Sequence, residues 1–279
     1  MKKITRRSFL AAAGLTAAAL ALTACGGSSS STASSTASSA ADSSEAASSS
    51  AATELTTVEA GKLTMATNAA FPPYEMTTDT GAFEGIDVDT AQAIAEKLGL
   101  ELQIDDMDFD AALLSVQQGK ADIVMAGVTV TDERKAVMDF SDSYATGIQS
   151  IIVPEGSDIA SPDDLAGKKI GTQRGTTGYI YCSDDFGDEN VVAYDDGLTA
   201  VQALNNGQVD AVVIDNAPAK EFIAANPGLV ILETSYAEED YAIGLAKGSS
   251  LEDAINSALE ELKADGTLQS IVDKYITAD

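Results

Sequence analysis

The sequence has 279 residues with 16 basic and 44 acidic side chains, a formal net charge of −28 at pH 7, and no histidine. The strong negative charge disfavours binding to nucleic acids and to anionic lipid headgroups, because both attract basic surfaces. The lack of histidine excludes a Ser-His-Asp triad, a Cys-His dyad and a histidine-rich transition-metal site.

The N-terminal residues have the pattern of an export signal. A basic start precedes an apolar run too short to span a bilayer and then Leu22-Thr23-Ala24-Cys25. These four residues resemble a bacterial lipobox, which implies a signal peptide over 1–24, a lipid such as palmitate on Cys25, and an extracytoplasmic protein anchored to the cell membrane. TRRSFL at 5–10 also resembles a twin-arginine signal, so the export route stays open.

The segment after Cys25 is predicted to be a disordered linker over residues 25–56. It consists almost wholly of Gly, Ser, Ala and Thr, which cannot bury enough apolar surface to fold. Without the four basic residues of the signal, the chain has 12 basic and 44 acidic residues and a formal net charge of −32. We interpret this acidity as a solubilising surface.

Strand and helix patterns alternate in the following region, which predicts α/β sheets covered by helices. The predicted strands are 62–67, 101–104 and 123–126, and the predicted helices are 87–98, ended by Gly99, and 109–118.

A faint internal repeat predicts two similar lobes. LLSVQQGKADIVM at 113–125 parallels VQALNNGQVDAVV at 201–213. Both segments are typical of a helix stopped by a glycine with positive φ, then an aspartate and a buried parallel strand. A recurring αβ motif without common lobes remains the alternative.

The lobes are predicted to be joined by two crossing strands, near 148–153 and at 241–246. The first lobe would comprise 57–147 and 242–279, and the second lobe 148–241 with the hinge strands. The closing helices, 251–262 and 268–275, are expected to pack on the first lobe.

Other reactive residues are given structural interpretations. Asp105-Asp106, Asp184-Asp185 and Asp195-Asp196 lack the spacing of a calcium loop and are expected to be solvated turns, so no metal site is predicted. Cys182 has no second cysteine to pair with once Cys25 is acylated, and is interpreted as a buried, inert thiol.

Loops at the carboxyl ends of the predicted strands carry groups suited to a small charged ligand. Outside the signal the only arginines are Arg134 and Arg174, and both fall in these loops. Arg134 can grip a carboxylate, assisted by Thr177 at a helix start, and Asp215 can face an ammonium, which together favour an amino-acid zwitterion over a phosphate. The structural alternatives are a surface Arg134 paired with a neighbouring acid and an Asp215 that caps the helix 216–225.

Several ordered motifs carry a resemblance to a known family: TNAAFPPYE at 67–75, GIDVD at 85–89, AGVTVTDER at 126–134 and MDFSD at 138–142. They resemble the family 3 extracellular solute-binding proteins, the polar amino-acid receptors of ABC importers, over residues 61–276. The resemblance implies a two-lobe, type II periplasmic-binding-protein-like α/β fold with two hinge strands.

By resemblance, Arg134 binds the ligand's α-carboxylate with Thr129 and Thr177, while Asp215 and the backbone at Gly127 bind the α-ammonium. Phe71 and Phe109 flank the ligand side chain, and the further candidate site residues are Asn68, Ala126, Gln173 and Thr176. Asn68 stands where relatives often carry an acid, so a basic amino acid and glutamine both stay open, with Glu75 and the aspartates around Phe109 favouring the basic one.

The sequence therefore predicts a monomeric, lipid-anchored receptor that captures a polar L-amino acid and delivers it to importer permease subunits, without catalysis or a cofactor. A ligand-binding sensor without an importer, and a cyclohexadienyl-dehydratase-like enzyme, are the alternatives.

Overall fold

The computed structural model describes residues 55–276. The predicted signal peptide, Cys25 and nearly all of the predicted linker lie outside the described residues. Among those residues, no helix combines the length and apolar character needed to cross a membrane. The α-helices are α1 Ile86–Leu98, α2 Phe109–Gln117, α3 Asp132–Val137, α4 Thr177–Phe186, α5 Gly197–Asn205, α6 Asn216–Ala225, α7 Glu252–Ala264 and α8 Thr267–Tyr275.

The first lobe is built on a five-stranded sheet in the order β5-β1-β6-β14-β7. Its strands are β1 Lys62–Thr67, β5 Glu101–Asp106, β6 Ile123–Val124, β7 Met138–Phe140 and β14 Gly244–Ala246. β1 pairs in parallel with β5 and β6, and five of its six residues are buried, as expected for a strand covered on both faces. Helices α1 and α2 pack on β1, and α7 and α8 pack on α1, as predicted for the closing helices.

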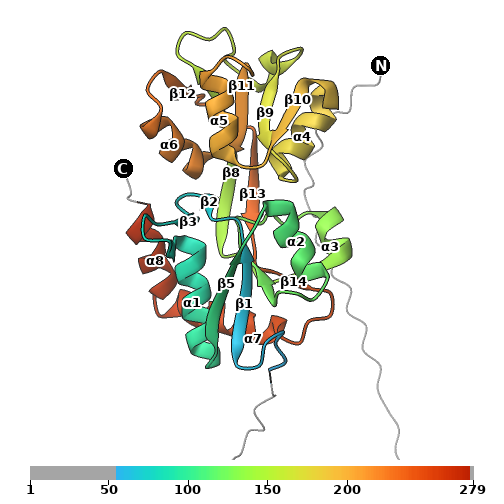
Figure 1. The fold of residues 1–279 in the computed structure, drawn as a ribbon, viewed down its shortest axis with the longest axis vertical. Helices are drawn as coiled ribbons and strands as arrows, with labels where there is room; N and C mark the ends of the chain where they lie inside the picture. Colours follow the sequence, from blue (N-terminus) through green and yellow to red (C-terminus); the bar gives the residue numbers. More distant parts are fainter. Residues whose placement is uncertain (1–54, 277–279) are drawn as a thin grey trace, which may run out of the picture. The chain divides into compact units, whose positions relative to one another are not determined.

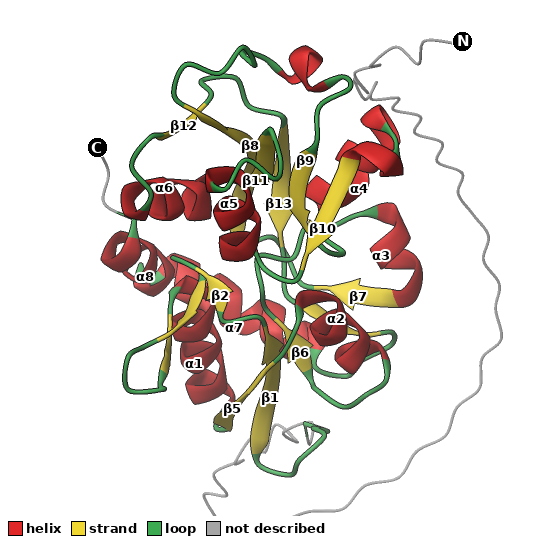
Figure 2. Cartoon of the chain, turned by 45° about the horizontal axis from the view of Figure 1, so that its top comes forward, coloured by secondary structure: helices red, strands yellow, loops and turns green. Residues whose placement is uncertain are grey.

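The second lobe is built on a six-stranded sheet in the order β10-β9-β11-β8-β12, with β13 also paired to β8. Its strands are β8 Ala145–Pro154, β9 Ile170–Gln173, β10 Val191–Tyr194, β11 Ala211–Asp215, β12 Leu229–Ile231 and β13 Ala237–Tyr241. β9 is parallel to β10 and β11, whereas β8 is antiparallel to its neighbours. Helices α4, α5 and α6 lie beside these strands in Figure 2.

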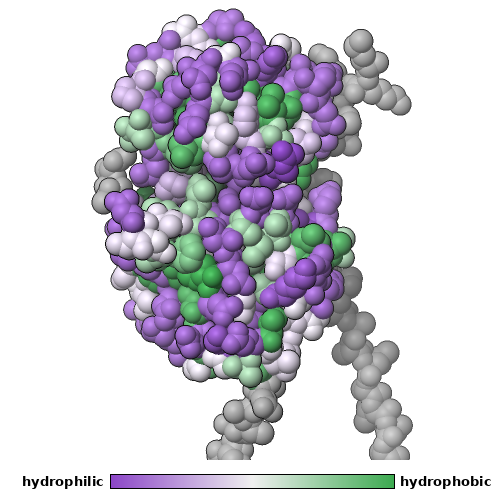
Figure 3. All heavy atoms as spheres, in the orientation of Figure 1, coloured by the Kyte–Doolittle hydropathy of each residue, from purple (hydrophilic) through white to green (hydrophobic). Residues whose placement is uncertain are grey.

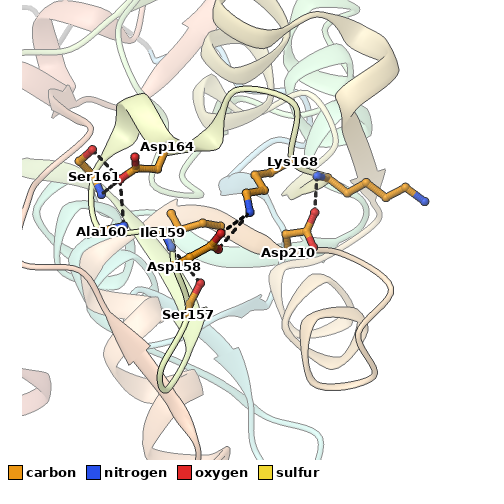
Figure 4. Close-up of polar contacts among 9 residues, drawn as sticks. Ser157, Asp158, Ile159, Ala160, Ser161, Asp164, Lys168 and Asp210 are labelled. Atoms are coloured by element: carbon orange, nitrogen blue, oxygen red, sulfur yellow. Dashed lines mark hydrogen bonds and ion pairs between the residues drawn. The ribbon is translucent and has the colours of Figure 1, made fainter.

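A short helical turn and its contacts lead the chain from β8 into β9. The 3₁₀ helix Pro162–Leu165 is capped by Ser161 and Asp164, and Lys168 contacts both carboxylate oxygens of Asp158 at 3.0 Å (Figure 4). A second 3₁₀ helix, Asp188–Asn190, joins α4 to β10. The face of the molecule drawn in Figure 3 is largely hydrophilic, with apolar residues in separate patches, in line with the acidic composition.

The internal repeat forms the same local structure in both lobes, a helix-ending glycine followed by an aspartate that accepts a backbone N–H. Gly119 after α2 has φ 66° and Gly207 after α5 has φ 67°, as the sequence predicts. The following aspartates, Asp122 and Asp210, each accept a backbone N–H at 2.8 Å from the start of a neighbouring strand region, at Thr64 and Lys169. Each aspartate therefore fixes where its strand enters the parallel sheet.

The two lobes are joined by paired strands, although one predicted strand is wrong. β8 and β13 are antiparallel neighbours and run side by side between the two groups of helices (Figure 1). The expected single strand 241–246 is two strands, because β13 ends at Tyr241 and β14 begins at Gly244. The break occurs where the chain leaves its partner β8 and joins β6 and β7 of the other sheet.

The aspartate pairs differ from their predicted structure, whereas Cys182 is buried as predicted. Asp105-Asp106 lie in β5 and Asp184-Asp185 in α4, so two of the three expected turns are wrong, while Asp196 lies in a loop and caps α5. A pair of aspartates does not by itself end a strand or a helix, and both elements continue through these two pairs. Cys182 is buried without a disulfide, and burial raises the pKa of its thiol to about 12, as an inert thiol requires.

A small sheet that the sequence analysis did not predict lies beside the first lobe's main sheet. It consists of β2 Ala70–Phe71, β3 Glu75–Thr77 and β4 Phe83–Glu84 in that order. Strands of two or three residues leave no periodic pattern in a sequence. This sheet fixes the positions of Phe71 and Glu75.

Candidate functional site

The candidate residues line one cavity between the lobes. The structure brings together all eleven sequence-predicted candidates and adds Glu75: Asn68, Phe71, Glu75, Phe109, Ala126, Gly127, Thr129, Arg134, Gln173, Thr176, Thr177 and Asp215. Most of them lie at or after the ends of β1, β5, β6, β9 and β11, as expected for an α/β sheet, whereas Phe71 and Glu75 lie on the small sheet of β2, β3 and β4. The space open to the centre of a water molecule is only about 10 Å³, roughly one water position. An amino acid can therefore enter only if the lobes separate.

Arg134 is a buried cation that reaches across to the second lobe. Its side chain is on α3 and the residue is 8% exposed. Nη1 donates to the carbonyl of Thr129 at 2.6 Å and Nη2 to that of Gly175 at 3.2 Å, while the guanidinium lies 5.4 Å from the ring centroid of Phe109. Burial lowers the pKa of Arg134, opposed chiefly by the negative charge of Glu239. The alternative of a surface arginine paired with a neighbouring acid is wrong.

Asp215 is a buried carboxylate at the end of β11. It occupies the N-cap position of α6, but its side chain makes no capping hydrogen bond. Oδ2 instead accepts from Gln149 Nε2 at 2.7 Å, and Oδ1 accepts from the hydroxyl of Tyr241. Burial raises the pKa of Asp215 to about 7. The capping alternative is therefore wrong for the side chain, which instead lines the cavity.

Two further buried acids lie next to this cavity. Asp87 accepts from the Gly127 backbone at 3.0 Å and from the Tyr144 hydroxyl at 2.7 Å, and burial raises its pKa to about 6. Glu75 is fully buried in the cavity wall and lies next to Asp87. Burial and the charge of Asp87 raise the pKa of Glu75 well above its usual range. A cation close to Glu75 would favour its ionised form.

Three polar contacts across the cavity join residues of the two lobes. Gln173 Nε2 donates to Asn68 Oδ1 at 2.8 Å, and the hydroxyls of Thr129 and Thr177 lie 3.5 Å apart. The third is the bond from Arg134 to Gly175. Side chains that bind a ligand here would therefore also govern whether the lobes stay together.

Sequence reasoning missed three buried residues on the hinge strands: Gln149, Glu239 and Tyr241. Gln149 donates to Asp215 and Glu239, and Tyr241 donates to Asp215. The segment AEEDY of β13 looks solvated in the sequence, but Glu239 and Tyr241 are two residues apart and face the same buried side. Period-two alternation ending at the large Tyr241 was the signal that could have found Glu239.

The fold and the cavity are those of a two-lobe binding protein with a cavity between its lobes. The chain belongs to the bacterial extracellular solute-binding proteins, family 3, whose model matches residues 63–278. The members are solute-binding proteins and not enzymes, so the dehydratase alternative is not supported.

Similar proteins are named for the amino acids that they bind. The L-cystine-binding protein TcyJ of Escherichia coli is 33% identical over 79% of this chain and 85% of its own length. The arginine-, lysine-, histidine-binding protein ArtJ of Geobacillus stearothermophilus is 34% identical, with a TM-score of 0.75, over 78% of this chain and 96% of its own. An ancestral arginine-binding protein bound to arginine is 43% identical, with a TM-score of 0.74, over 77% of this chain and 98% of its own.

Proposed function

We propose that the chain is the substrate-binding lipoprotein of an amino-acid ABC importer and that it captures a cationic L-amino acid between its lobes. The observation that carries this proposal is the presence of Arg134 and Asp215, both 8% exposed, on the wall of one cavity and on different lobes. A guanidinium and a carboxylate in one small cavity match the two ends of a zwitterion. A phosphate would be repelled by Asp215.

The backbone of the ligand would be bound by groups from both lobes. Arg134 would take the α-carboxylate, with hydroxyls from Thr129 and Thr177 close by. Asp215 would take the α-ammonium, with the backbone at Gly127. Since the ligand touches both lobes, it stabilises the arrangement in which they are together and shifts the hinge equilibrium.

The side chain of the ligand would lie near Glu75, Phe71 and Phe109. Glu75 lies beside Asp87, whose negative charge raises its pKa, so a guanidinium or ammonium group placed near both carboxyl groups would favour the ionised form of Glu75. The two phenylalanine rings offer faces on which a planar cation gains further attraction. Relatives named for arginine support this choice. Glutamine and cystine, also represented among relatives, are the competing ligands.

We further propose the organisation that the sequence indicates. It comprises a signal peptide at 1–24, a linker at 25–56 that begins with lipid-bearing Cys25, a first lobe of 57–147 and 242–279, and a second lobe of 148–241. The protein would act as a monomer on the outer face of the cell membrane and present ligand to the permease. Mass spectrometry of the membrane-extracted protein tests the lipid. A Cys25→Ala variant that stays attached to membranes would contradict the anchor.

The ligand is tested by isothermal titration of the chain without its signal, carrying Cys25→Ser, against all twenty amino acids. We expect arginine or lysine to bind best. Glu75→Gln should weaken binding of the cationic ligand at least tenfold more than binding of glutamine, because it removes the ionisable partner. Glu84→Gln, an exposed glutamate on β4 of the same small sheet, is the matched control. No heat of binding with any amino acid would overturn the proposed function.

A further inference from the structure

Glu239 brings a fourth acidic side chain to the site from a hinge strand. It lies on β13 and is 6% exposed. Its Oε2 accepts hydrogen bonds at 3.0 Å from Thr129 Oγ1 of the first lobe, Thr177 Oγ1 of the second lobe, and Gln149 Nε2 of β8. One carboxylate oxygen therefore joins both lobes and both hinge strands.

These contacts use the hydroxyl protons that a ligand carboxylate needs. A threonine hydroxyl has a single proton to donate. While Thr129 and Thr177 donate to Glu239, they offer only lone pairs to another anion next to Arg134. A ligand carboxylate on Arg134 must then either take these protons from Glu239 or do without them.

Glu239 also acts on Arg134 through its charge. Burial lowers the pKa of Arg134, and the negative charge of Glu239 is the chief group that opposes this shift. A carboxylate that already neutralises part of a buried guanidinium reduces what a second carboxylate gains by approaching it. The hydrogen bonds and the charge of Glu239 thus both weaken the binding of a ligand carboxylate at Arg134.

We propose that Glu239 is a specificity-determining residue that competes with the α-carboxylate of the ligand for Thr129, Thr177 and Arg134. It lowers the affinity for amino acids and leaves the binding of carboxylate-free analogues nearly unchanged. This inference rests on the proposed function, because it requires an amino acid whose carboxylate lies at Arg134.

The test compares the parent chain with Glu239→Gln, which keeps the shape and removes the charge. The ligands are L-arginine and L-argininamide or, if another amino acid binds best, that amino acid and its carboxamide. Glu239→Gln should tighten binding of the amino acid about tenfold and change binding of the carboxamide less than threefold. Glu238→Gln, the exposed neighbour on β13, should change neither.

The outcomes separate the two proposals. A parent that binds no amino acid overturns the proposed function together with this inference. A parent that binds, with a Glu239→Gln variant that does not tighten or that changes both ligands equally, overturns the inference alone. If the variant does not fold, carbon-13 NMR of glutamate-labelled parent decides. The Glu239 carboxyl resonance should shift with the amino acid and not with its carboxamide, and equal shifts would overturn the inference.

Discussion

The hydroxyl of Tyr241, on hinge strand β13, donates a hydrogen bond to the carboxylate of Asp215, at the end of β11. Gln149, on hinge strand β8, holds the other oxygen of the same carboxylate. The group that we propose to bind the ligand's ammonium is thus held by side chains from both strands that join the lobes. Ligand capture and hinge geometry are thereby coupled through direct contacts.

Tyr241→Phe should weaken amino-acid binding about tenfold, because it removes one of the two side-chain donors that stabilise ionised Asp215. The variant should also move the pH midpoint of binding upward. Titration calorimetry at several pH values measures both effects. Tyr74→Phe is the matched control, since its ring packs edge-on against Tyr241 at 5.3 Å without bonding to Asp215. Equal effects of the two changes would argue against a special role for the Tyr241 hydroxyl.

Arg134→Met should reduce binding of every amino acid at least a hundredfold, because the ligand carboxylate loses a charge-assisted partner in a buried site. Arg174→Met offers a natural comparison. Arg174 is the other arginine of the lobes, its side chain is 52% exposed, and its partner Asp195 lies 3.5 Å away on the surface. We expect its loss to leave affinity unchanged within twofold. An Arg134→Met protein that binds within threefold of the parent would show that the carboxylate lies elsewhere.

Amino-acid affinity should fall as the pH is lowered from 8 to 5, by up to about tenfold per pH unit below the pKa of Asp215. Burial raises that pKa to about 7, and the ligand's ammonium requires the ionised form. Binding near pH 6.5 should therefore release a proton, which calorimetry in buffers of different ionisation heat detects. Affinity that stays constant, or rises toward pH 5, would exclude Asp215 as the ammonium partner.

The raised pKa of Asp215 has the opposite effect on the stability of the ligand-free protein, which falls as the pH rises. A carboxyl group whose pKa is higher in the folded state than in the unfolded chain binds more protons when folded. It therefore contributes most below about pH 4, and this contribution is lost as the pH rises toward 7. Thermal unfolding of Asp215→Asn against the parent at pH 4 and pH 7.5 checks this. We expect the variant to be relatively more stable at the higher pH.

Gly147→Ala should destabilise the protein by about 1–3 kcal/mol and weaken ligand binding. A methyl group at Gly147, on β8, would clash with the ring of Tyr241, which is fully buried. Displacing that ring also moves the hydroxyl away from Asp215. Thr146→Ala, at the exposed neighbouring position, should change stability by less than about 0.5 kcal/mol. Thermal denaturation of both variants makes the comparison.

The regular parts of the fold were predictable from local chemistry. β1 at Lys62–Thr67 coincides with the predicted strand, and α1 ends at Leu98, before Gly99, as the helix-stop signal indicates. The repeat at Gly119 and Gly207 was also predictable, because a glycine with positive φ between a helix and a buried strand leaves a clear pattern. These features depend on neighbours in the sequence.

The remaining features depend on contacts between distant residues. Tyr241 and Asp215 are 26 positions apart, and Glu239 and Thr129 are 110 apart. Only the period-two alternation that ends at Tyr241 distinguishes the buried Glu239 from its exposed neighbours Glu238 and Asp240. The candidate residues Arg134 and Asp215 were found because loops after strands gather at one edge of a sheet, and motif resemblance gave them roles. Side chains that enter the site from hinge strands do not follow that rule.

The contacts that join the two lobes across the cavity have a kinetic consequence. The contacts between Asn68 and Gln173 and between Arg134 and Gly175 join the lobes across the cavity, so they must break before a ligand can leave. The rate at which the lobes separate is therefore an upper limit on the dissociation rate of every ligand. Guests that differ widely in equilibrium affinity would then leave at rates no faster than the molecule itself opens.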